Sequence, residues 1–142
     1  MRPSKLTKKC LYPTSAGLVL TGLLWLLSHY FMKVQGEFGP ENHPLEIWSI
    51  RLHGLFSVGI LLCIGMLIEH HILTYFKRRK HLWTGLTLAI TLGWLSISGY
   101  LIYYLVDDTW REYTSLAHWV IGLAVIVLFL AHLNVKRFSQ AS

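Results

Sequence analysis

The sequence predicts an all-α protein built as a bundle of four transmembrane helices, and its composition gives the first reason. Of its 142 residues, 54% are hydrophobic and only 14% are charged, whereas soluble domains carry about 25% charged residues. The mean hydropathy is +0.46. At this length we expect one domain, 1–142, because single domains usually have about 150 residues.

Four apolar segments give the second reason, because each is long enough to cross a hydrocarbon core of about 30 Å as a helix. Strands are disfavoured, since runs of this length lack alternation and would leave sheet edges unpaired in lipid. The connection between the first two segments, 33–51, is long, polar and interrupted by Gly and Pro. We expect the helices at about 16–32, 52–73, 82–106 and 113–135.

The boundaries of each helix follow from the residues around it. The first, 16–32, follows a basic start like that of a signal peptide, but no small-x-small cleavage site follows and His29 lies inside. We therefore expect this helix to be retained. The second ends before the basic run 77–80, and the third begins after this run with Trp83 near its boundary. The fourth starts after an acidic loop and ends where the last two basic residues of the chain begin.

Positive charge indicates the orientation. Ten of the 13 Lys and Arg residues fall on one side of the predicted bundle, and most acidic residues lie in or beside the loops of the other side. Both termini are therefore expected in the cytoplasm, with the chain in a bacterial inner membrane. Because the basic residues flank apolar segments and do not cover one face, nucleic acid is not expected as a partner.

Several kinds of chemistry have no motif in this sequence. It contains no P-loop, GxGxxG, HExxH or GxSxG pattern, so nucleotide binding and the common hydrolase reactions have no support. It also lacks the CxxCH motif of covalently attached c-type haem. Cys10 lies before the first predicted helix and Cys63 lies in the middle of the second, so we expect them at different depths and unpaired.

Histidine is the informative residue type. Ionisable side chains inside a membrane are rare and each needs a partner. A single such histidine most often serves packing, but several at matching depths indicate a site. Six of the eight lie in or at the ends of predicted helices, namely His29, His53, His70, His71, His118 and His132.

The fourth helix places two histidines on one face at two depths. His118 and His132 are 14 residues apart, which corresponds to about 21 Å of rise and a rotation about 40° short of whole turns. Between them lie Gly122, Val125 and Phe129, a small residue and two apolar ones that suit contact with a flat macrocycle.

The second helix repeats this arrangement. His53 and His71 are 18 residues apart, which is five whole turns and about 27 Å, whereas His70 points about 100° away. The second and fourth helices run in the same direction, so His53 matches His118 in the outer third of the membrane. His71 matches His132 near the cytoplasmic end. Two opposed pairs predict bis-histidine ligation of two haem b groups.

This pattern resembles the four-helix membrane cytochromes b, the haem b subunits of respiratory formate dehydrogenases and nickel hydrogenases. The resemblance rests on the His-x13-His spacing in AHWVIGLAVIVLFLAHLN and on the segment LSISGYLIYY, where Gly99 leaves space for a ring. It implies a non-catalytic subunit that carries electrons between a quinone pool and a redox partner protein or larger membrane complex. The acidic outer loops would suit docking of a basic partner.

The wider histidine spacing of the second helix leaves the inner ligand open. If the outer pair is level, His71 lies about 6 Å deeper than His132, and a helix tilt of about 20° would absorb much of this difference. Otherwise His70 or His81 is the inner ligand.

The outer ligand from the first half of the chain also has an alternative. In formate dehydrogenase-like subunits the first helix gives a ligand, and here His29 falls at the outer depth. It would compete with His53 for the iron or line a quinol site, and we favour His53.

The remaining charged residues have secondary roles in this hypothesis. Arg51 and Arg111 are candidates for pairing with haem propionates at the outer rim, and a plain interfacial role is equally open. Glu69 or Glu112 would carry a quinone proton, while His43 is expected to be solvated in the long connection.

Two other functions stay open at this point. One is a haem-free accessory subunit of a larger membrane complex, with its histidines satisfied by hydrogen bonds. The other is a metal or proton transporter, which is disfavoured because Glu69 is the single carboxylate near the membrane core.

Overall fold

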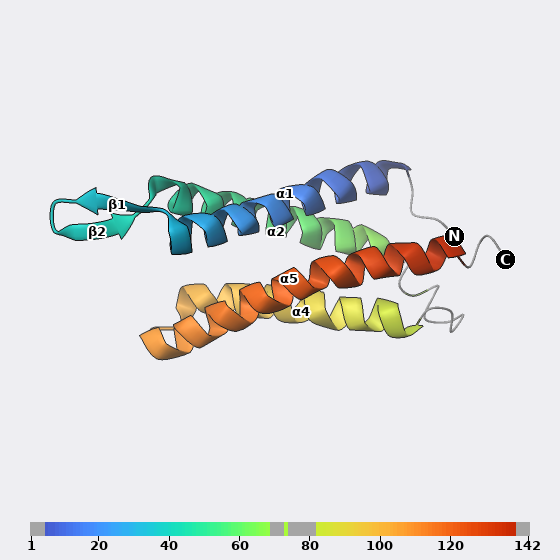
Figure 1. Ribbon diagram of the computed structural model, residues 1–142. Coiled ribbons are helices and arrows are strands. Elements are labelled where there is room, and N and C mark those ends of the chain that lie inside the picture. The colour runs from blue at the N-terminus through green and yellow to red at the C-terminus, as the bar shows by residue number, and fades with distance from the viewer. Residues whose placement is uncertain (1–4, 69–72, 74–81, 139–142) are drawn as a thin grey trace. The chain divides into compact units, whose positions relative to one another are not determined.

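The computed structural model describes residues 5–68, 73 and 82–138 and is 87% helical. Its elements follow one another along the chain as four long helices with one small strand pair (Figure 1). They are α1 (Lys5–Phe31), β1 (Lys33–Gly36), β2 (Gly39–Asn42), α2 (Pro44–Leu67), α4 (Leu82–Tyr104) and α5 (Asp108–Phe138).

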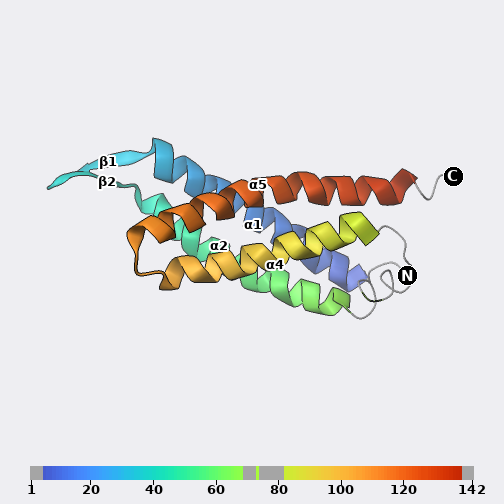
Figure 2. The ribbon, with the colours of Figure 1, turned by 90° about the horizontal axis from the view of Figure 1, so that it is seen from below.

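The chain divides into two compact units, Met1–Thr74 and Tyr75–Ser142, each containing one pair of helices. We call α1 with α2 the first hairpin and α4 with α5 the second hairpin. Within each, the two helices are antiparallel and lie side by side in both views of the ribbon (Figures 1 and 2).

The first hairpin is closed by the strands β1 and β2, which extend beyond the helix ends (Figure 1). They are antiparallel, with Lys33 opposite Asn42 and Gly36 opposite Gly39. Gly39 has a φ of 125°, a backbone conformation that only glycine adopts without strain. The chain therefore reverses tightly at the two residues between the paired glycines.

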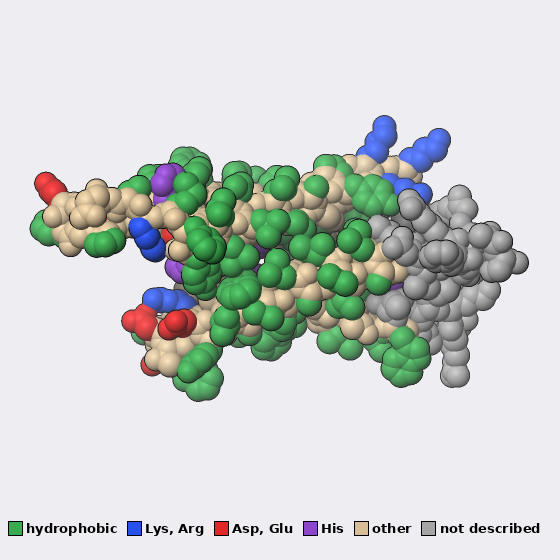
Figure 3. Space-filling model, viewed as in Figure 1, with side chains coloured by type: hydrophobic (Ala, Val, Ile, Leu, Met, Phe, Trp, Pro, Cys, Tyr) green, Lys and Arg blue, Asp and Glu red, His purple; other side chains and the backbone are tan. Residues whose placement is uncertain are grey.

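Both hairpins carry their apolar side chains outside and small polar ones inside. Ser28 and Ser98 are the most completely buried side chains among the described residues, at 1% and 0% exposure, whereas Leu55 is 66% exposed. On the face that Figure 3 shows, apolar side chains line the helices and charged ones lie towards the ends. Small residues at helix contacts and large apolar ones outside are typical of helices packed in lipid.

All four helices are long and apolar enough to cross a membrane, which confirms the predicted fold class and makes the chain a multi-pass membrane protein. The candidate spans are Lys5–Phe31, Pro44–Leu67, Gly85–Tyr104 and Asp108–His132. The cytoplasmic position of both termini remains a prediction from the distribution of charge.

Three helices begin earlier than predicted. We expected starts at 16, 52 and 113, and the structure has them at Lys5, Pro44 and Asp108. The polar first turns of these helices lowered the local hydropathy, so apolar runs alone placed the starts too late. The expected long loop 33–51 is thus a strand pair followed by the first two turns of α2.

The early start of α1 corrects the expectation for the cysteines. Thr14 faces Gly59 across the first hairpin, where a Cβ on the glycine would lie 2.8 Å from the threonine methyl. Four residues further along each antiparallel helix, this register brings Cys10 opposite Cys63, and both thiols are free. The prediction of different depths was therefore wrong, because Cys10 lies within α1 and not before it.

Candidate functional site

The first hairpin holds the imidazole of His53 against the backbone of α1. Its Nδ1 lies 3.0 Å from the carbonyl oxygen of Leu18 and 3.3 Å from the hydroxyl of Thr21. That hydroxyl donates to the carbonyl of Gly17 at 2.7 Å. A carbonyl oxygen only accepts, so Nδ1 carries the hydrogen of the neutral ring and the lone pair is on Nε2.

Gly22, the residue after Thr21, makes room for this ring. A Cβ at Gly22 would lie 3.2 Å from Cε1 of His53, which is closer than ordinary carbon contacts. The carbonyl of Leu18 and the hydroxyl of Thr21 fix the ring through Nδ1, and Gly22 lets the ring approach the helix. We call the hydroxyl residue and the glycine that follows it a cradle.

The second hairpin builds the same cradle around His118. Its Nδ1 lies 2.9 Å from the hydroxyl of Ser98, which donates to the carbonyl of Leu95 at 3.3 Å. Because that hydroxyl hydrogen is used, the hydroxyl oxygen accepts from Nδ1 and the lone pair is again on Nε2. A Cβ at Gly99 would lie 3.2 Å from Cε1 of His118.

The two cradles share the order of their residues and nearly the same distance from the start of the helix that carries the histidine. In each, a hydroxyl residue followed by glycine on the first helix of a hairpin holds a histidine on the second helix. His53 is the ninth residue after Pro44 at the start of α2, and His118 is the tenth after Asp108 at the start of α5. Histidine ligands of metals have their Nδ1 held by such a bond, which fixes the tautomer and the direction of Nε2.

His132 lies further along α5 and also has a glycine opposite it. A Cβ at Gly85 would lie 3.8 Å from Cε1 of His132. Gly85 and Gly99 are 14 residues apart on α4, the same spacing that separates His132 from His118 on α5. Gly99 was expected to leave space for a ring, and the ring that the structure places there is the imidazole of His118.

His29 has a different partner, a carboxylate. Its Nδ1 lies 2.8 Å from Oε1 of Glu46, which belongs to the first turn of α2. Its ring stacks on Trp25 with centroids 4.7 Å apart and an interplanar angle of 19°. The sequence pattern missed Glu46, because the late predicted start of α2 placed it in a loop.

The other residues singled out in the sequence have local roles. Arg51 lies over the ring of Trp48 at 5.4 Å, and Arg111 forms an ion pair with Asp108. His43, expected to be solvated, caps α2, and its Nδ1 accepts from the amide of Leu45 at 3.1 Å. The pairing of Arg51 and Arg111 with haem propionates therefore stays a prediction.

Several predicted residues are outside the part that the structure describes. These are the inner ligand candidates and the proton carrier of the second helix, namely Glu69, His70, His71 and His81. Glu112 is described and is exposed on α5. Within the described ranges, no three His, Cys, Asp or Glu side chains gather as ligands of a bare metal ion.

Comparison of the chain with models of protein families, with curated proteins and with solved structures found no match.

Proposed function

We propose that the protein is a di-haem b cytochrome of the bacterial inner membrane, which moves electrons between a quinone pool and a redox partner protein. In this proposal His53 and His118 ligate the outer haem, and His132 ligates the inner haem together with His71. The observation that carries the proposal is the matched cradle in the two hairpins, which presents one histidine from each by the same means.

The residues present fit a haem ligated by two histidines. Such a site needs two neutral imidazoles whose Nε2 atoms have fixed directions, and the Nδ1 bonds of His53 and His118 provide this. The apolar helices around them exclude water, which tunes the potential of an iron held there. When bound, haem supplies one-electron redox chemistry.

A purely structural role accounts for the cradles less well. A buried histidine needs hydrogen-bond partners, and Leu18 and Ser98 supply them in either case. Packing alone does not require the same hydroxyl-glycine order in both hairpins, nor a glycine opposite His132 at the same spacing. A shared cofactor geometry explains all three features together.

His53 is preferred over His29 as the outer ligand. His29 lies about 10 Å nearer the strand pair, because Glu46 opposite it precedes His53 by seven residues of helix. His53 has the same kind of cradle as His118 and lies at nearly the same distance from the start of its helix, whereas His29 is held by a carboxylate and stacked on Trp25.

A pyridine haemochrome assay on protein purified in mild detergent tests the proposal. We expect about two b-type haems per chain, with alanine at His118 or at His132 removing one each. His43→Asn is the matched control, because asparagine also caps helices well and His43 lies outside both cradles. A colourless protein, despite haem supplied during expression, would overturn the proposal and favour a haem-free accessory subunit.

A further inference from the structure

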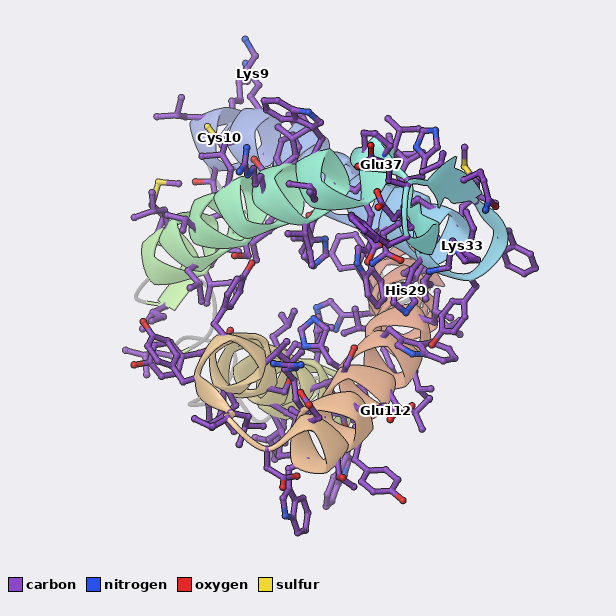
Figure 4. All side chains as sticks on the ribbon, turned by 90° about the vertical axis from the view of Figure 1, so that its left-hand side faces the viewer. Lys9, Cys10, His29, Lys33, Glu37 and Glu112 are labelled. Carbon is purple, nitrogen blue, oxygen red and sulfur yellow. The ribbon has the colours of Figure 1, made fainter. Side chains whose placement is uncertain are left out.

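The contact between His29 and Glu46 closes the first hairpin at the end next to the strand pair, where Figure 4 looks along the helices and labels His29. The two side chains come from different helices and are 17 residues apart in sequence. The side chain of Glu46 is 12% exposed and that of His29 is 34% exposed. The carboxylate is therefore mostly buried, and the imidazole partly reaches the surface.

One oxygen of this carboxylate is bonded and the other is not. Oε1 of Glu46 takes the bond to His29, while Oε2 is buried with no hydrogen-bond partner among the described residues. Nε1 of Trp25, whose ring stacks on His29, is a buried donor that also has no hydrogen-bond partner among the described residues. Buried polar atoms are normally paired, so this cluster has one acceptor and one donor to offer to a ligand.

The walls of the cluster are aromatic. Trp25 and His29 stack, and Tyr30 meets the edge of the His29 ring at 4.8 Å with an interplanar angle of 88°. Flat aromatic surfaces favour a planar ring. A planar ligand that has hydroxyl hydrogens to donate and oxygens to accept matches both the walls and the unpaired atoms.

We propose that Glu46 and His29 form a proton-accepting site for a lipid-soluble hydroquinone. This inference rests on the proposed function, which supplies the electron acceptors. The hydroquinone loses two protons and two electrons and leaves as the quinone. Each breaking O–H bond gives its proton to Oε2 of Glu46, from which His29 passes it to water. The two electrons would pass, one to each, to two oxidised haems, which His53, His118, His71 and His132 would hold.

The position of the pair suits this reaction. Glu46 lies in the first turn of a candidate membrane span, so the pair lies at an end of the span, which a ligand dissolved in lipid would reach. His53 follows Glu46 by seven residues of α2, which is about 10 Å along the helix axis. The site therefore differs from the carboxylates that the sequence suggested, Glu69 and Glu112.

Glu46→Gln tests the role of the carboxylate, because glutamine keeps an oxygen for His29 but removes the base. Reduction of the protein by a short-chain benzohydroquinone should be about a hundredfold slower than in wild type. Reduction by dithionite and the haem content should be unchanged. Glu37→Gln is the matched control, since Glu37 is an exposed glutamate at the tip of the strand pair (Figure 4).

A second measurement does not depend on haem. A ligand that binds the folded state raises its melting temperature. An alkylated 1,3-dihydroxybenzene, which has the hydroxyl hydrogens of a hydroquinone but forms no quinone, should therefore raise the melting temperature of wild type and of Glu37→Gln. It should not raise that of the double variant Glu46→Gln with Trp25→Phe. This result would support the site even if the protein were colourless and the proposed function failed. The inference would be overturned if the Glu46 variants had the reduction rate and the melting-temperature shift of wild type. It would also be overturned if Glu112→Gln, and not Glu46→Gln, slowed the reduction.

Discussion

Ser98 is the residue at which the contribution of a cradle can be measured most directly. Its hydroxyl is the partner of His118 Nδ1 at 2.9 Å. Ser98→Ala removes this partner, and loss of such a partner typically weakens metal binding by a factor of about 10 to 100. We expect haem to pass to an apo-globin acceptor at least about tenfold faster than from wild type.

Ser96→Ala is the control for this measurement. Ser96 lies on the same helix, is exposed and bonds the carbonyl of Leu92 at 2.9 Å within its own helix. Equal rates of haem loss from the two serine variants would show that the bond to His118 does not support ligation.

Gly99 tests the second half of the cradle, the space for the ring. A valine there would place its Cβ 3.2 Å from Cε1 of His118 and its methyl groups closer still, which displaces the imidazole. We expect the haem content of Gly99→Val to fall to about one per chain. Gly93→Val is the control on the same helix, because a Cβ at Gly93 meets nothing within 4 Å. An equal haem content in both variants would contradict the role of Gly99.

The sequence indicated the histidines of the candidate site but not what holds them. His53 and His118 follow from their positions within apolar segments and their spacing along each helix. The identification of Thr21, Ser98 and Glu46 as partners of the histidines requires knowing which residues face each other across a hairpin. Helix register sets those pairs, and an apolar pattern that is similar on all sides of a helix contains little information about register.

At the scale of the elements, hydropathy located the membrane spans and misplaced their ends. The start of α2 shows why. Its first turn contains the charged residue Glu46, which lowers the hydropathy there, yet Pro44 lies in this turn and His43 caps it. Proline at the first position is a start signal that does not depend on hydropathy. Caps and turn residues therefore locate these starts better than apolar runs do.

The register of the first hairpin can be tested with its own cysteines. The register that places Thr14 against Gly59 predicts that Cys10 faces Cys63 one turn further on. We expect mild oxidation with copper phenanthroline in detergent to join them within one chain, seen by mass spectrometry as the loss of a pair of hydrogen atoms. The control is the double variant Cys10→Ser with Tyr12→Cys, which moves the thiol to another face of α1, where Tyr12 is 48% exposed. Equal cross-linking from both positions would contradict this register.

At the scale of the whole molecule, the chain repeats one device in two units. Each hairpin presents a histidine from its second helix, held by its first helix, at nearly the same distance from the helix start. In the proposed function each hairpin would supply one axial ligand to the outer haem, so a bis-histidine site would need both hairpins. The proposal therefore gives both helix pairs a role.

Charge predicts the orientation of the helices in the membrane, and this prediction can be measured with reporters. Ten of the 13 Lys and Arg residues lie within 2–9, 77–80 and 136–137, and segments rich in such residues usually stay in the cytoplasm. We expect green fluorescent protein fused to the C-terminus to fluoresce and alkaline phosphatase fused there to be inactive. Phosphatase inserted between Glu37 and Phe38, at the exposed tip of the strand pair, should be active. The opposite pattern would place the His29–Glu46 pair on the cytoplasmic side, so that protons from a hydroquinone would be released inside the cell.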